Sequence, residues 1–92
     1  MRSRSVVSVS LLESAQVEAV EVILESGAPA EGIPLMKAGL PAECLVGAYV
    51  RNETTHIPDG RSILTAGDRV IILIRTPCSA KVLPYFKGRK SL

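Results

Sequence analysis

The sequence predicts an α+β domain, with a small, mostly antiparallel sheet of about five short strands and two short helices. Three observations support this fold class. The run Val70–Ile74 is apolar throughout and mostly β-branched, which is typical of a central strand covered on both faces. Residues Val7–Leu11 alternate between apolar side chains and serines, which is typical of a half-buried strand. The connections between the predicted elements are short, and short connections favour antiparallel neighbours.

The chain has the composition of a single globular domain. Its 92 residues are 47% hydrophobic and 22% charged, which is enough apolar material for a modest core. Aromatic residues make up only 3%, so valine, isoleucine and leucine must fill this core. Cys44 and Cys78 lie far apart without C-x-x-C spacing, which predicts two small buried side chains in a reducing compartment.

Charge and hydropathy exclude two classes of partner. The net charge is only +2, and the densest basic run, Lys87–Lys90, lies near the C-terminus, so we expect no nucleic-acid binding. No apolar run approaches the ~18 residues that a membrane span needs, so we expect no direct membrane insertion. The sequence therefore predicts a cytoplasmic protein.

The segment Glu18–Glu25 fits two structures. A helix would place Ala15, Ala19 and Ile23 on one face, and glutamates favour helices. A strand would alternate apolar and polar faces over the same residues. We favour the strand, because the segment is short and rich in β-branched residues. The side chains expected on its buried face are Val20, Val22 and Leu24.

A short helix and a further strand are predicted in the middle of the chain. Pro34 suits the first turn of a helix Pro34–Ala38, which Gly39 would end. The next strand is Cys44–Arg51, within which Gly47 indicates close backbone approach by a second chain or a ligand. The residues expected to anchor the helix to the sheet are Leu35, Met36 and Leu40. The residues expected on one face of the strand are Cys44, Val46, Ala48 and Val50.

Three turns are predicted before the central strand. The pair Asn52–Glu53 is expected to form a hairpin turn that returns through Thr54–Ile57. Residues 63–64 are expected to form one helical turn. Gly67 can take the positive φ of a sharp reversal, and Asp68 can accept hydrogen bonds from backbone amides there.

The chain ends with a predicted helix. Thr76 is a suitable N-cap and Pro77 a suitable first helical residue, so the helix is expected to run through Leu83. Pro84 would stop the helix, because proline cannot donate the next backbone hydrogen bond. The aromatic pair Tyr85–Phe86 would then fold back over the core.

Residues that could support catalysis are few. His56 is the only histidine, and its spacing to the two cysteines matches no zinc motif. Neither a G-x-x-x-x-G-K-[ST] loop nor a G-x-G-x-x-G loop is present, so phosphate cradles of these two types are absent. Arg51 is the most suggestive charge, because it could bind a phosphate or pair with Glu53 or Asp59. The sequence therefore predicts neither an enzyme nor a metal site.

An ordered set of short motifs resembles a known family. The set comprises Gly32, Leu35, Leu40-Pro41, the strand Leu45–Arg51, Ile57-Pro58, Leu64, Gly67-Asp68, Val70 and Ile72. It is similar to the C-terminal domain of potassium-conductance regulators, the domain found in the TrkA potassium-uptake subunit. On this basis residues 1–4 are a disordered basic N-terminus, residues 5–86 the TrkA C-terminal-like domain, and residues 87–92 a basic tail.

The resemblance implies a regulatory module without catalytic activity. Domains of this family dimerise and follow a nucleotide-binding Rossmann domain, and the assembly docks on the cytoplasmic face of a potassium transporter or channel. The resemblance thus implies a homodimer at the inner face of the plasma membrane, with a Rossmann-type regulator domain and a membrane transporter subunit as partners. Because the chain starts where the Rossmann half would end, we expect a fragment or a separately encoded module.

A ligand groove is a further implication of the resemblance. In some relatives the dimer groove binds a cyclic dinucleotide, so this or another nucleotide is the cofactor implied, and folding requires none. The alternative is a purely structural dimerisation domain without a ligand. A third hypothesis is a small enzyme with Cys44 or Cys78 as nucleophile. The residues expected at the ligand or dimer groove are Gly32, Ile33, Pro34, Leu35, Leu45, Val46, Gly47 and Arg51.

Overall fold

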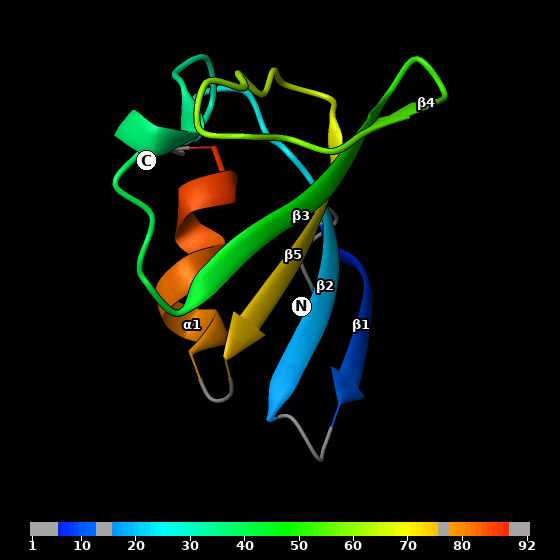
Figure 1. Ribbon diagram of the computed structural model, residues 1–92, viewed down its shortest axis with the longest axis vertical. Coiled ribbons are helices and arrows are strands. Elements are labelled where there is room, and N and C mark those ends of the chain that lie inside the picture. Colours follow the sequence, from blue (N-terminus) through cyan, green and yellow to red (C-terminus); the bar gives the residue numbers. More distant parts are fainter. Residues whose placement is uncertain (1–5, 13–15, 76–77, 89–92) are drawn as a thin grey trace.

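Five strands form one antiparallel sheet, and the helical segments pack on one of its faces (Figure 1). The computed structural model describes residues 6–12, 16–75 and 78–88. Within these residues the strand order is β1-β2-β5-β3-β4, and all neighbours are antiparallel. The strands are β1 (Val6–Leu12), β2 (Val17–Ile23), β3 (Cys44–Arg51), β4 (Thr54–His56) and β5 (Arg69–Arg75). The predicted α+β class and antiparallel sheet are confirmed.

β5 is the central strand, as the apolar run predicted. It lies between β2 and β3, and Val70, Ile72 and Ile74 are completely buried on the helical side. The expectation that both faces are covered is wrong within this chain, because Ile71 and Leu73 on the opposite face are only half buried. The described helical segments and loops contribute their buried side chains to one face, which leaves the other partly open.

β2 is a strand, and the helical alternative is wrong. It pairs with β1 on one side and with β5 on the other, so both edges of its backbone are hydrogen-bonded in the sheet. Val20 and Val22, together with Leu24 just beyond the strand, are each 1% exposed, which confirms the predicted alternation. Pairing on two sides outweighs the modest helix preference of the glutamates.

β3 contains a bulge that reverses its alternation. The register with β5 shifts between Val46 and Ala48, so Gly47 is the extra residue. Beyond it Tyr49 enters the core, whereas Ala48 is only half buried, and the predicted strict alternation is therefore wrong after Val46. A Cβ on Gly47 would lie 3.7 Å from the carbonyl oxygen of Ile71, an ordinary contact. Within this chain the glycine therefore marks the bulge and no unusually close approach.

The predicted helical turn at residues 63–64 is wrong. Ile63 instead forms an isolated β-bridge with Pro34. The carbonyl groups of Ser62 and Leu64 accept hydrogen bonds from the amides of Leu35 and Gly32, at 2.9 and 2.8 Å. Because these carbonyls bond to another segment, they are not used in a local helical turn.

The helices are shorter than predicted. The segment predicted as helix Pro34–Ala38 is a single 3-10 turn, η2 (Leu35–Lys37). The last predicted helix contains α1 (Ser79–Val82), and its predicted first residues 76–77 lie outside the described residues. Pro84 does not stop the chain from turning, because the 3-10 helix η3 (Leu83–Phe86) accepts proline in its first turn, where no amide donor is needed.

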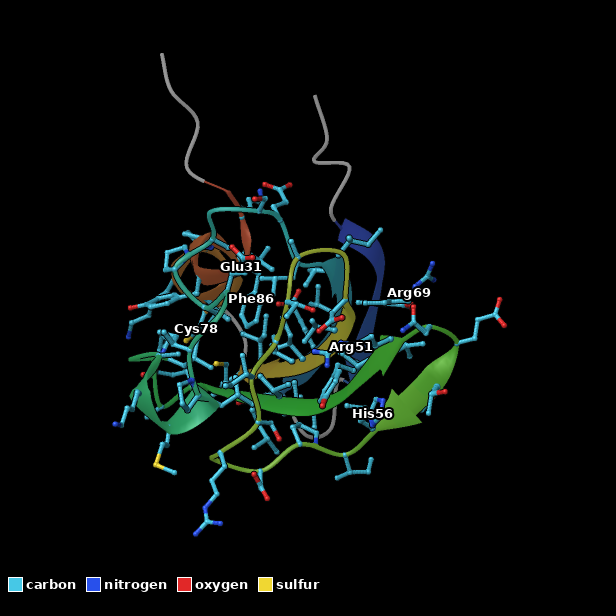
Figure 2. The ribbon with its side chains drawn as sticks, turned by 90° about the horizontal axis from the view of Figure 1, so that it is seen from above. Glu31, Arg51, His56, Arg69, Cys78 and Phe86 are labelled. Carbon is cyan, nitrogen blue, oxygen red and sulfur yellow. The ribbon has the colours of Figure 1, made fainter. Side chains whose placement is uncertain are left out.

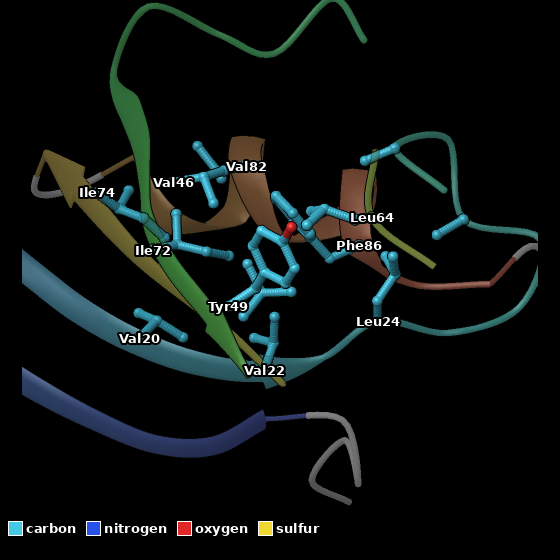
Figure 3. Close-up of a cluster of buried hydrophobic side chains, with 13 residues drawn as sticks. Val20, Val22, Leu24, Val46, Tyr49, Leu64, Ile72, Ile74, Val82 and Phe86 are labelled. Carbon is cyan, nitrogen blue, oxygen red and sulfur yellow. The ribbon is translucent and has the colours of Figure 1, made fainter. Parts of the chain in front are cut away.

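The core is mostly aliphatic and lies between the sheet and the helical layer (Figure 3). Phe86 folds back into it and is 1% exposed, as predicted. Hydrogen bonds from the Glu25 and Ala30 amides to the Phe86 and Tyr85 carbonyls, at 3.1 and 2.9 Å, attach the loop after β2 to η3. The buried residues are Val20, Val22, Leu24, Ala28, Ala30, Val46, Tyr49, Leu64, Val70, Ile72, Ile74, Val82 and Phe86.

The two predicted tails fall largely outside the structure's described part, which omits residues 1–5 and 89–92. The first residues of the predicted C-terminal tail are attached to the domain. The amide of Gly88 donates a 2.6 Å hydrogen bond to Oε1 of Glu25. In the ranges 6–12, 16–75 and 78–88, no helix is long and apolar enough to cross a membrane.

Candidate functional site

An apolar groove lies between η2, the first half of β3 and the loop at residues 58–60. Its volume is about 280 Å³. Most of the lining is hydrophobic, and Asp59 supplies its charge. The lining residues are Leu35, Met36, Leu40, Cys44, Leu45, Val46, Pro58, Asp59 and Gly60. Such a lining suits apolar side chains better than an anionic ligand.

Backbone hydrogen bonds build the wall of this groove. The amide of Met36 donates to the carbonyl of Gly60 at 2.9 Å, next to the bonds that join residues 32 and 35 to residues 64 and 62. Asp59 in turn organises its own loop, since its Oδ1 accepts a 2.9 Å hydrogen bond from the Arg61 amide. A Cβ on Gly60 would lie only 3.2 Å from the Cβ of Met36, so glycine allows η2 to lie this close.

Large apolar side chains are exposed around the groove. Met36 and Leu45 line it and are 63% and 62% exposed, and Ile57, beside the lining residue Pro58, is 81% exposed. Met36 was expected to anchor η2 to the sheet, and this expectation is wrong. Clusters of exposed apolar side chains on a folded domain often mark surfaces that bind another molecule.

A second hollow of about 290 Å³ shares one edge with the groove. Cys44 and Leu45 line both, so Leu45 forms the ridge that separates them. The remaining lining residues are Val17, Ala42, Glu43, Leu73 and Arg75, from the ends of β2 and β5 and the approach to β3. The two hollows together extend the apolar surface from η2 to the open face of the sheet.

Arg51 is bound within the protein. Its Nε and Nη2 donate to Oδ1 and Oδ2 of Asp68 at 2.9 and 2.6 Å, and Nη2 also donates to the carbonyl of Ile63 at 3.0 Å. Its guanidinium lies 5.0 Å from the centre of the Tyr49 ring. The partner is therefore Asp68, and the predicted pairing with Glu53 or Asp59 is wrong. Arg51 is labelled in Figure 2.

Asp68 is the buried partner in this cluster and is 2% exposed. Burial alone would raise the pKa of its carboxyl group. Hydrogen bonds from Arg51 and from the amide of Thr65, the latter at 2.9 Å, more than offset this, so the pKa lies below its ordinary value. The same bond raises the pKa of Arg51. The predicted role of Asp68 as an acceptor of turn amides is confirmed.

His56 is paired with Tyr49 near the end of β3, whereas Cys44 opens that strand, so the histidine does not join the cysteines in one site. His56 stacks on the Tyr49 ring, with 4.9 Å between the ring centres. Cys44 and Cys78 are both free and half buried, and burial followed by the nearby Glu43 raises the pKa of the Cys44 thiol. A raised pKa reduces the reactive thiolate. Among the described residues, no three histidine, cysteine or acidic side chains are placed to hold a metal ion.

The structure brings only part of the predicted site together. Leu35, Leu45 and Val46 line the groove, and Gly32, Ile33 and Pro34 form the segment leading into η2. Gly47 lies at the bulge, and Arg51 at the far end of β3 is bound to Asp68. Lining residues that the sequence did not place at the groove are Met36, Leu40, Pro58, Asp59 and Gly60. The Pro58-Asp59-Gly60 turn signal could have indicated the far wall.

A family model, the TrkA-C domain, matches residues 19–87. This chain belongs to the TrkA-C domain family. The matched residues include the whole groove and the Arg51–Asp68 cluster, and β1 lies before them. The resemblance to the C-terminal domain of the TrkA subunit is thereby confirmed.

Curated relatives of this TrkA-C domain chain are much longer proteins. It is 31% identical over 84 residues to the Trk system potassium uptake protein TrkA homolog 1 of Methanosarcina mazei. This alignment covers 91% of this chain and 19% of the relative. The chain is 31% identical over 70 residues to the Trk system potassium uptake protein TrkA homolog of Archaeoglobus fulgidus, covering 76% of this chain and 16% of the relative. The chain thus spans less than a fifth of either relative.

Proposed function

We propose that this chain is a non-catalytic regulatory module of a potassium-uptake system. The observation that carries the proposal is the TrkA-C match over residues 19–87, together with relatives named as Trk system potassium uptake proteins. The scattered titratable groups agree with a role in binding. The module works as a homodimer, and the apolar groove forms the dimer interface.

The groove supports this proposal by its chemistry. Met36, Leu45 and Ile57 expose most of their side chains around it, which is unfavourable unless another surface covers them. The predicted residues Leu35, Leu45 and Val46 lie within it. A two-fold interface buries the same patch on both copies, so Leu45 of each protomer would be covered at once.

Regulation in this proposal is a shift in population. The dimer holds two arrangements, and a ligand or partner that binds one of them more tightly increases its share. The partners we propose are a Rossmann-type regulator domain and a membrane transporter or channel subunit for potassium. The module then lies on the cytoplasmic side, peripheral to the inner face of the plasma membrane.

A purely structural dimerisation domain is the second candidate function, and one observation favours it. Arg51, the residue considered for phosphate binding, donates to both oxygens of Asp68 and to the Ile63 carbonyl. The groove itself carries the negative charge of Asp59. A cyclic dinucleotide would bring its two phosphates to a surface at which none of the described lining residues is a cation, which disfavours binding there.

The dimer is tested by substituting Leu45, which forms the ridge between the two hollows. We expect sedimentation equilibrium of the full chain to give a dimer, and Leu45→Glu to weaken it at least about tenfold, because a charge would be buried in an apolar contact. Leu45 is 62% exposed in one protomer, so the variant should still fold. Thr54→Glu, on the exposed edge strand β4, adds the same charge away from the groove and should leave the dimer intact. A monomeric wild type, or equal weakening by both variants, would contradict this assignment.

The ligand is tested by calorimetry. Cyclic dinucleotides and adenine nucleotides are titrated into the wild type and into Leu45→Glu. Heat in the wild type that disappears in the variant supports a ligand at the groove, and the absence of heat with every nucleotide supports the structural dimerisation domain.

A further inference from the structure

The two cysteines lie in adjoining segments although they are far apart in the sequence. Cys44 opens β3 and is directly paired with Ile74 near the end of β5. Cys78 follows β5 and immediately precedes α1. The Arg75 amide donates to the Glu43 carbonyl at 2.8 Å, and the Cys78 amide donates to the Arg75 carbonyl at 2.7 Å. One short chain of hydrogen bonds therefore connects the residue before Cys44 to Cys78 itself.

Side-chain contacts hold the same two segments together. Nζ of Lys81, in α1, lies 3.3 Å from Oε1 of Glu43. The amides of Lys81 and Val82 both donate to the carbonyl of Cys78, at 3.0 and 3.2 Å, so Cys78 anchors the first turn of α1. Figure 1 shows the start of β3 beside α1. The backbone around both cysteines is thus fixed by hydrogen bonds and an ion pair.

Both cysteines pack against the same layer of the molecule. Cys44 and Cys78 are half buried, and both pack against the core cluster that lies between the sheet and α1. Cys44 shares the buried face of the sheet with its partner Ile74, which is completely buried. Figure 2 shows Cys78 on the side of α1 that faces the start of β3. A disulfide requires two cysteines whose Cα atoms lie within roughly 7 Å, so adjoining segments and a shared layer are requirements for its formation.

We infer that Cys44 and Cys78 form a redox-sensitive pair that a peroxide or a diazene oxidises to an intramolecular disulfide. Two S–H bonds break and one S–S bond forms. The two electrons and two protons pass to the oxidant, which becomes water and an alcohol, two waters, or a hydrazine. Excess dithiol reverses the reaction by thiol–disulfide exchange.

The pair connects the oxidation state of the protein to the groove. Cys44 lines both the groove and the second hollow, so a bond to Cys78 would fix this wall to α1. The reaction should be slow, since burial, and next the charge of Glu43, raise the pKa of the Cys44 thiol and reduce its thiolate fraction. Exposure to oxidant for hours, rather than seconds, is therefore appropriate.

The test uses the full chain and diamide, a diazene, as oxidant. The protein is treated in its folded state, denatured, alkylated and weighed by mass spectrometry. We expect loss of both alkylation sites, a mass lower by two hydrogen atoms, and a linked peptide containing Cys44 and Cys78. Cys44→Ser and Cys78→Ser should each keep one alkylatable thiol. Cys44→Ala and Cys78→Ala, at the same two positions, keep the test possible if a serine variant fails to fold.

The stability of the oxidised protein gives a second readout. A disulfide that fits the native structure should raise the midpoint of thermal unfolding by roughly 5–15 °C, and dithiothreitol should reverse the shift. Two thiols that remain alkylatable after oxidation would overturn the inference, as would disulfides formed only between chains. An intramolecular bond with an unchanged or lower midpoint would also overturn it, because the native fold would then not hold the two sulfurs together.

Discussion

Asp68 is the charged residue on which the turn before β5 depends. Its carboxylate is 2% exposed and accepts hydrogen bonds from Arg51 on β3 and from the Thr65 amide. The backbone of Asp68 is also held in place, because its carbonyl accepts a 2.8 Å hydrogen bond from the Leu24 amide. Asp68 thus connects β3 to the turn through its side chain, and it connects the turn to the end of β2 through its backbone carbonyl.

Asp68→Asn should destabilise the protein. The substitution removes the charge that Arg51 pairs with, but 35% of the Arg51 side chain is exposed and water will solvate part of it. We therefore expect a loss of about 2 kcal/mol in the free energy of unfolding, less than for a fully buried pair. Urea unfolding measures this. Lys81→Gln, which removes an exposed pair, should change the stability by no more than about 0.5 kcal/mol. Equal effects of the two substitutions would contradict the special role of Asp68.

The contribution of Asp68 should depend on pH. Its pKa in the folded protein is lower than the ordinary 3.8, so below this value the unfolded chain binds the proton first. The stabilisation is therefore complete above the ordinary pKa and is lost as the pH falls through the folded pKa. The difference in unfolding free energy between the wild type and Asp68→Asn should be constant above about pH 5 and shrink below about pH 4. A difference that grows on acidification would refute this explanation.

Among the elements, β3 departs most from its sequence pattern. The period-two pattern predicted one continuous apolar face, but the bulge at Gly47 brings Tyr49 into the core, where its ring contacts both His56 and Arg51. Bulges depend on pairing with the neighbouring strand, and the pattern of one strand does not contain that information. By contrast β5 was predictable from its continuous run of mostly β-branched apolar residues, and β2 from its short length and β-branched content.

Substitutions at two glycines should distinguish a position that requires a positive φ from a position that only forms a bulge. Gly67 has a φ of +94°, so Gly67→Ala should cost about 1–2 kcal/mol of stability from backbone strain. Gly47 has no positive φ, and a Cβ there would make only an ordinary contact, so Gly47→Ala should change the stability by less than about 1 kcal/mol. Urea unfolding of both variants checks the order. A larger loss at Gly47 would mean that the bulge cannot accept a side chain.

At the scale of the whole molecule, one aliphatic core is closed by two segments that are distant in sequence. The loop after β2 supplies Ala28 and Ala30, and η3 supplies Phe86, while backbone bonds join the loop to η3. Figure 3 shows Phe86 beside Leu24 and Leu64. The end of the domain is therefore held both by packing and by hydrogen bonds.

Phe86→Ala should loosen this closure. Removing the ring leaves a cavity and should cost about 3–4 kcal/mol. Hydrogen exchange should quicken most at the amides of Glu25 and Ala30, which donate to η3. Pro84→Ala, an exposed position in the same segment, is the matched control and should leave this exchange nearly unchanged. Uniform quickening across the sheet, without a local excess, would contradict a local role for Phe86.

The candidate site was only partly predictable for the same reason as β3. Leu35, Leu45 and Val46 could be selected because they belong to predicted elements with apolar patterns. Pro58, Asp59 and Gly60 form a loop, and backbone bonds from the segment at residues 32–36 help to place it across the groove. The commitment of Arg51 to Asp68 likewise joins residues from two strands, and no local pattern indicates it.

The backbone hydrogen bonds that form the wall of the groove have a consequence for how the sequence of this domain can diverge. Because amides and carbonyls of residues 32–36 and 60–64 hold the wall in place, most of the side chains that face the cavity are not needed to support it. Met36 and Leu45 could therefore be exchanged for other residues without rebuilding the scaffold. Such an arrangement would allow new specificities to evolve on an unchanged architecture, one side chain at a time.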